Sequence, residues 1–183
     1  MSESARVVLD LHKLGEGVPA LTPALGQVHA ECAAVCLEHQ GHLESVELHV
    51  RKSPEANYEL SMPRVTDEMR RAHHDLQRAT EFGACGVALL LAREVTGLTA
   101  IQQSRKGTGF DYWLGPADQP RDLLVFQNSA RLEVSGILEG TDKQIIARLK
   151  QKLRQSEPSD ATRLPAYAVV VEFGRPQAEL AKR

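Results

Sequence analysis

The chain has 183 residues and a formal net charge of −2 at pH 7, with 42% hydrophobic and 25% charged residues. This average composition excludes global disorder and fibrous repeats, and the length suits one domain or one domain with an extension. The longest apolar run, residues 87–92, is far shorter than the roughly 20 residues of a membrane span, so we expect no membrane partner. Three cysteines and no apolar leader indicate a reducing, cytoplasmic location.

Charge is distributed unevenly along the chain. Residues 1–62 contain nine acidic residues against four Lys and Arg, whereas residues 63–183 contain fifteen against eighteen. The most basic stretch, residues 143–154, has five Lys and Arg and no acidic residue. Nucleic acid is therefore the expected partner of the second part, with DNA favoured over RNA, although a solvated helix face explains this stretch equally well. A protein partner or a homodimer is left open.

The first 62 residues predict a strand, a helix and a hairpin. Alternation of apolar residues over residues 6–14 predicts a strand, and helical spacing from about Leu25 to a glycine stop at Gly41 predicts a helix. Residues 45–51 and 57–63 alternate in period two around "KSPEA", which is typical of a hairpin. We expect residues 1–62 to form an accessory region, either as a layer on the main sheet or as an oligomer contact.

Residues 63–183 predict a sheet with helices on its faces. A long helical tract, residues 66–97, begins at a Thr66 cap, and Gly83 and Gly86 within it indicate two helices or a bent one. Because a helix between two strands usually makes them parallel neighbours, we expect an α/β (α+β) fold with a mixed central sheet. Its strands are expected at residues 98–104, 109–114, 130–138 and 166–173, with a helix at residues 141–156.

The segment "GTGFDYWLG" places Asp111 among aromatic residues in a chain that is only 4% aromatic. A carboxylate in such surroundings needs a cation, a proton or hydrogen-bond donors to replace its lost hydration. On the following strand, Glu133 shares a face with Arg131 and Ser135. If the two strands pair, Asp111 and Glu133 converge on one point, where two oxygen ligands suit Mg²⁺ or Mn²⁺.

The order helix, strand, Asp111 strand, Glu133 strand, helix, strand resembles the core of the PD-(D/E)XK nuclease superfamily, over roughly residues 80–174. This resemblance implies a restriction-endonuclease-like core at residues 63–183, with residues 1–62 as a strand-helix-hairpin extension. It further implies a magnesium-dependent hydrolase that cleaves phosphodiester bonds of nucleic acid, with restriction or phage defence as its setting. By the same resemblance Asp111 and Glu133 are metal ligands, and Glu81 is an auxiliary acid.

The sequence departs from the superfamily pattern at Ser135, where the resemblance calls for a lysine. A cation at this point orients the attacking water and stabilises negative charge, whereas a serine can only orient. We therefore expect the change to affect rate more than metal binding, with Ser135 kept as a catalytic candidate. A side chain from elsewhere could replace the missing lysine, and the candidates are Arg131, Lys106, and Lys143 or Gln144. Gln103, on the preceding strand, could also reach the pocket.

The turn "SRKGTG" precedes Asp111 and carries two basic residues between a strand end and two glycines. Such an exposed turn could contact a backbone phosphate, although a hairpin turn with solubilising charges explains it equally well. The candidate nucleic-acid-binding residues are Arg105, Lys106, Arg131, Lys143 and Lys150.

Two alternatives compete with an active nuclease. In the first, Asp111 forms a structural salt bridge with Arg105 or Arg131. In the second, the chain is a catalytically degenerate module that binds nucleic acid or a protein partner without cleaving it. The basic helix, with Lys150 and Lys152, would then carry the binding in a salt-dependent way.

A zinc site is suggested by the pattern H-x-x-C-x-x-x-C-x-x-H, which begins at His29. On one straight helix, however, His29 and His39 would stand roughly 15 Å apart, too far to meet at one ion. We therefore expect Cys32 and Cys36 to be core residues, and His73, on a charged helical stretch, to be a surface residue.

Overall fold

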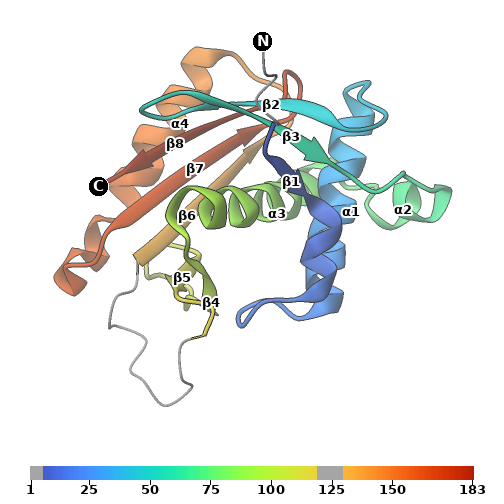
Figure 1. Cartoon of the computed structure of the whole chain (residues 1–183). Coiled ribbons are helices and arrows are strands. Elements are labelled where there is room, and N and C mark those ends of the chain that lie inside the picture. The colour runs from blue at the N-terminus through green and yellow to red at the C-terminus, as the bar shows by residue number, and fades with distance from the viewer. Residues whose placement is uncertain (1–5, 119–129) are drawn as a thin grey trace, which may run out of the picture.

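The computed structural model describes residues 6–118 and 130–183 as a mixed α/β structure with one eight-stranded sheet (Figure 1). The strands are β1 (Val8–Asp10), β2 (Val46–Arg51), β3 (Ala56–Ser61), β4 (Thr99–Gln103), β5 (Tyr112–Gly115), β6 (Ala130–Ile137), β7 (Ala166–Glu172) and β8 (Gln177–Lys182). The helices are α1 (Pro23–His39), α2 (Asp67–Ala72), α3 (Leu76–Thr96) and α4 (Asp142–Gln155), with 3-10 helices η1 (Leu11–Glu16) and η2 (Glu157–Thr162).

The sheet order is β1-β3-β2-β8-β7-β6-β5-β4. Strands β6 and β7 are parallel and connected through α4, as expected from the helix between them. The β2–β8 and β1–β3 pairs are also parallel, and the remaining neighbours are antiparallel. The predicted mixed sheet is thereby confirmed. The N-terminal strands extend this same sheet edge to edge through β2 and do not form the layer on the sheet that was expected for residues 1–62, while the oligomer contact stays a prediction.

Alternate residues of β6 point to opposite faces of the sheet. Gly136 faces α3 so closely that an added Cβ would lie 2.4 Å from the Thr80 carbonyl oxygen. Glu133 and Ser135, which point the other way, form hydrogen bonds with side chains of α4. Helix α3 therefore covers one face and α4 the other, and α1 packs against α3 (Figure 1). The face under α4 is the one that presents the acidic candidate Glu133.

Three local predictions differ from the structure. The first strand is only three residues long because the Asp10 side chain accepts a hydrogen bond from the His12 N–H and starts η1, which buries Leu11 and Leu14 at a spacing of three. The helical tract is interrupted before α3, where Asp75 caps the helix, and not at Gly83 or Gly86. Strand β8 was not anticipated, because its apolar residues alternate only weakly.

Gly83 serves close packing between helices. A Cβ at this position would lie 2.8 Å from the backbone Cα and N of Ala33 in α1. Helix α3 can therefore approach α1 only because this position has no side chain. None of the helices in residues 6–118 and 130–183 combines the length and apolar character of a membrane span.

We predict that Gly83→Ala destabilises the protein by about 1–2 kcal/mol, because forcing α1 and α3 apart outweighs the gain in helix propensity. Gly15→Ala is the matched control, since an added Cβ there meets nothing within 4 Å. Urea denaturation of both variants measures the difference. A Gly83→Ala protein as stable as the Gly15→Ala protein would contradict the packing argument.

Candidate functional site

Asp111 lies at the point where β5 and β6 separate. Its N–H donates to the Leu132 carbonyl oxygen at 2.8 Å, and its Oδ2 accepts a hydrogen bond from the Val134 N–H, also at 2.8 Å. Because β5 begins only at Tyr112, the Asp111 carboxylate takes the place of a strand partner for this N–H. The β6 backbone therefore fixes the carboxylate, and within the described residues no ion pair joins it to Arg105 or Arg131.

Glu133 meets both Asp111 and a lysine from α4. Its side chain is 7% exposed and lies within hydrogen-bonding range of the Asp111 carboxyl. Its Oε1 accepts a hydrogen bond from Lys152 Nζ at 2.5 Å. The two acids thus converge on one point of the sheet, as the pairing argument required, and an ammonium group reaches the same point.

Burial, and next the charge of Asp111, raise the pKa of Glu133 to about 7, while Lys152 opposes the shift. The folded chain therefore binds a proton more tightly at this carboxyl than an unfolded chain would. The contribution of Glu133 to stability is complete below its ordinary pKa and is lost as the pH rises through about 7. A second cation beside the two acids would favour the ionised form of Glu133 further.

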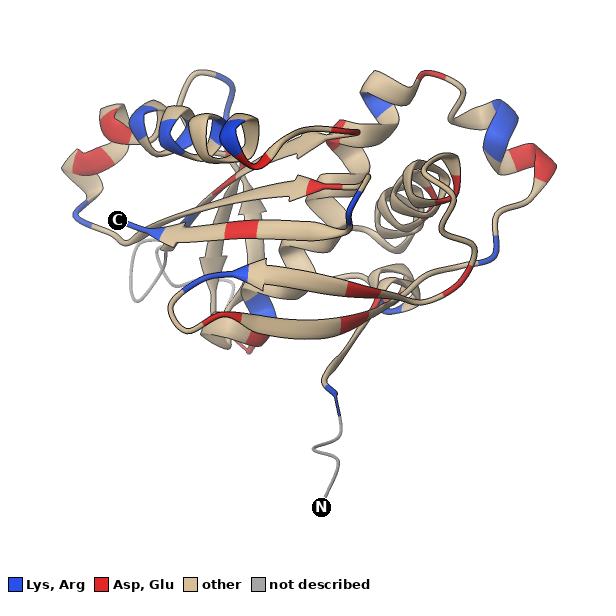
Figure 2. Cartoon of the chain, turned by 90° about the horizontal axis from the view of Figure 1, so that it is seen from above, with Lys and Arg blue, Asp and Glu red and all other residues tan. Residues whose placement is uncertain are grey.

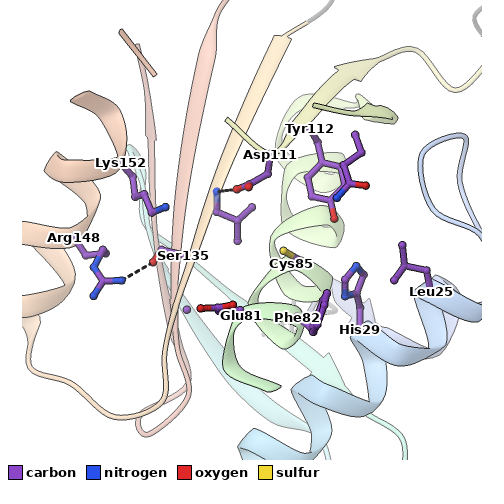
Figure 3. A pocket seen from close by; sticks show the side chains of 13 residues that line it. Leu25, His29, Glu81, Phe82, Cys85, Asp111, Tyr112, Ser135, Arg148 and Lys152 are labelled. Atoms are coloured by element: carbon purple, nitrogen blue, oxygen red, sulfur yellow. Dashed lines mark hydrogen bonds between the residues drawn. The ribbon is translucent and has the colours of Figure 1, made fainter. Parts of the chain in front are cut away.

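Arg148 and Lys152 stand four residues apart on α4, so they share one helix face. Arg148 Nη1 donates to Ser135 Oγ at 3.0 Å, while Lys152 contacts Glu133. Figure 3 shows both side chains reaching from α4 toward β6. From the sequence, Lys152 is predicted only as a binding residue of the basic helix and Arg148 is not predicted as a site residue, although their spacing within the basic stretch is a signal that could have placed both on one face toward the acids.

Arg131 lies away from the acids, although it shares a strand face with Glu133. It is 3% exposed and bound to the segment around η2, through the carbonyl oxygens of Ser156 and Leu164 and the side chain of Asp160. This guanidinium therefore holds η2 against β6. A phosphate in solution has no access to it in this arrangement.

The other basic candidates are exposed and lie on two elements. Arg105 and Lys106 line an open groove of about 560 Å³ that also reaches Asp111 and Glu133. Lys143 and Lys150 lie on α4, whose length carries a series of basic positions (Figure 2). Neither Lys143 nor Lys150 lines a cavity around the acids. Gln144 forms the helix capping box with Thr141.

A second cavity of about 560 Å³ is also lined by Asp111 (Figure 3). Glu81 enters it from α3 and Gln103 from β4, so both candidates border the cavity that contains Asp111. Asp111 and Gln103 also line the groove that contains Arg105 and Lys106, so Asp111 lies between the groove and the cavity, whereas Glu133 lines only the groove.

Two adjacent carboxylates, of which Glu133 has a raised pKa, are a donor set that Mg²⁺ or Mn²⁺ fits, since a divalent charge would relieve their repulsion. Among the residues that the structure describes, no group of three or more His, Cys, Asp or Glu could hold a metal. Magnesium is nevertheless commonly held by one or two carboxylates, with waters and substrate phosphates completing its shell. Asp111 and Glu133 are the residues that could hold it.

The cysteine stripe of α1 is part of the core, as predicted, since Cys32 is 1% and Cys36 0% exposed. His73, in contrast, is not a surface residue. Its Nδ1 lies 3.3 Å from Cys32 Sγ and its Nε2 lies 2.9 Å from Glu31 Oε2. The ring therefore helps to attach α2 to α1.

Comparison with protein families, with curated proteins and with solved structures found no match to this chain.

We predict that Lys152→Met lowers stability by about 1–3 kcal/mol at pH 8.5 and much less at pH 5, because an ionised Glu133 then lacks its partner. At pH 5 Glu133 is protonated in both proteins, so the loss fades. Lys150→Met, an exposed position on the same helix, is the control and should stay within about 0.5 kcal/mol of the parent at both pH values. An equal loss of stability in Lys152→Met at both pH values would contradict the assignment of Lys152 as the partner of ionised Glu133.

Proposed function

We propose that the protein is a magnesium-dependent nuclease with a restriction-endonuclease-like core, which hydrolyses phosphodiester bonds of nucleic acid. The observation that carries this proposal is the meeting of the Lys152 ammonium with the Asp111–Glu133 pair. Ser135 lacks the charge that the PD-(D/E)XK pattern has at this position, and a cation from α4 stands at the same acids in its place. The order α3, β4, β5, β6, α4, β7 further supports the likeness.

Asp111, Glu133 and Lys152 can each contribute to one part of phosphodiester hydrolysis. Asp111 is held by the Val134 N–H and Glu133 by Lys152, so both carboxylates are oriented before any substrate arrives. A divalent ion held by them would supply the Lewis acid that polarises the phosphate and lowers the pKa of the attacking water. Lys152 donates to that water or to a phosphate oxygen and stabilises negative charge at phosphorus.

The groove lined by Arg105 and Lys106, here called the basic groove, suits the phosphates next to the scissile phosphate. Arg105 and Lys106 line it, and it opens onto both acids. Arg148, fixed through Ser135, adds a further charge on the α4 side. Such contacts position a strand without reading its sequence and suit the phosphates of DNA and RNA alike, so the groove sets no base-specific requirement, and DNA stays the substrate class that we expect.

Cleavage assays with purified protein test the proposal directly. With Mg²⁺ or Mn²⁺ and single-stranded DNA, duplex DNA or RNA, the parent protein should cleave at least one substrate. Asp111→Asn, Glu133→Gln and Lys152→Met should each lower the rate about 10²–10³-fold, because each removes charge stabilisation at the reacting phosphate. Lys150→Met should retain the parent rate, which separates the site from general basicity of α4.

Equal cleavage by the parent and by Asp111→Asn would reveal a contaminating nuclease and refute the proposal. The alternative, a degenerate module that only binds, is favoured by the serine at position 135. It predicts no cleavage, salt-dependent retention of nucleic acid that weakens in Lys150→Met, and no Mn²⁺ binding that depends on Asp111. A gene neighbourhood rich in restriction or phage-defence functions would support the active form.

A further inference from the structure

The cavity that contains Asp111 and Glu81 has two chemically different ends. At one end stand Asp111, Ser135, Arg148 and Lys152, which belong to the proposed reaction site. The other end is apolar and aromatic, and it is lined by Leu25, His29, Phe82, Cys85 and Tyr112 (Figure 3). A ligand at the reacting end could therefore place an attached, less polar group at the other.

His29 is the unusual member of the apolar end. Its side chain, 1% exposed, enters from α1, and neither ring nitrogen has a hydrogen-bond partner in the described part of the chain. Its ring stands 5.5 Å from the Phe82 ring at a tilt of 35°. Burial lowers the pKa of His29 to about 4, against a smaller opposing effect of the nearby Phe82 backbone, so the ring is neutral at pH 7, with one donor and one acceptor nitrogen.

A buried polar group without a partner costs stability, and an apolar residue at this position would avoid the cost. The remaining polar groups at this end do not relieve it, since the Tyr112 hydroxyl and the Cys85 thiol interact with each other. The imidazole, which lines the cavity, therefore keeps one donor and one acceptor without a partner beside the space that a ligand would enter.

We propose that this end of the cavity binds the base of the nucleotide adjoining the scissile phosphate, with His29 hydrogen-bonded to the base edge. This deepens the proposed nuclease function and rests on it. The whole cavity, of about 560 Å³, lies within the size range of small-molecule sites, and its lining combines charged and polar side chains at the reacting end with apolar and aromatic ones at this end. Phe82 and Tyr112 offer aromatic surface to a base.

The geometry has a consequence for the substrate. A base inside a duplex stack cannot enter a side cavity unless it is extruded, which costs unstacking energy. The preferred substrate is therefore single-stranded nucleic acid, or a duplex in which the reacting nucleotide is unpaired. The phosphates on either side remain in reach of Lys152 and of the basic groove.

Binding measured without cleavage tests the proposal. Fluorescence anisotropy in Ca²⁺, which replaces Mg²⁺ to prevent hydrolysis, compares a labelled single-stranded oligonucleotide with an abasic oligonucleotide of the same length and charge. The parent protein should bind the base-bearing strand about 10-fold or more tightly than the abasic one. His29→Leu should weaken binding of the base-bearing strand about 3- to 10-fold and leave the abasic strand unaffected.

Thermal unfolding of the same variants supplies a second readout. His29→Leu should raise the melting temperature while it lowers base-dependent affinity, a combination that a purely structural histidine would not give. His29→Asn should recover part of the affinity because it restores a donor and an acceptor, and His39→Leu, an exposed position on the same helix, should change neither quantity.

The outcomes separate this proposal from the nuclease proposal. If the parent cleaves nucleic acid but binds both strands equally, the base site is refuted and the nuclease function stands. If the parent prefers the base-bearing strand and His29→Leu binds it as tightly, the role of His29 is refuted. If the parent neither binds nor cleaves either strand, both proposals fail together.

Discussion

The carboxyl pair of half-buried Asp111 and buried Glu133 constrains the arrangement of the groups around it. Two such groups at one point of a sheet lose hydration and repel each other, so their neighbours must supply compensating charge or hydrogen bonds. The Val134 N–H does so for Asp111 and the Lys152 ammonium for Glu133, and the pKa of Glu133 still stays near 7. This incomplete compensation distinguishes the pair from an ordinary structural ion pair.

Those features of the fold that follow from local chemistry could be predicted from the sequence. The β2–β3 hairpin, the cap of α2 at Thr66 and the alternation of β6 each depend on neighbouring residues, and all three are present. The convergence of Asp111 with Glu133 followed from the period-two alternation of β6 and from pairing with the preceding strand. The parallel β6–β7 pair followed from the helix between them.

The rest depends on contacts between distant segments, which no local pattern specifies. Gly83 and Gly86 were read as a helix break because a glycine lowers helix propensity, whereas Gly83 allows α3 to approach α1. Arg131 shares a strand face with Glu133, yet η2, whose position the sequence did not reveal, binds its guanidinium. Lys152 was placed on a basic helix, but the rotation of α4 that aims it at Glu133 is a tertiary property. His29 similarly looked like one residue of a helical pattern until its packing was known.

Strand β8 lies between β2 and β7, so the sheet joins its N-terminal strands to its central ones through residues 177–182. During synthesis on a ribosome, β1, β2 and β3 would emerge long before this bridging strand and would present an unpaired edge at β2 in the meantime. Vectorial folding therefore cannot finish the sheet until β8 has left the exit tunnel. Until then β6, which carries Glu133, and the β2–β3 hairpin are not joined by a continuous sheet.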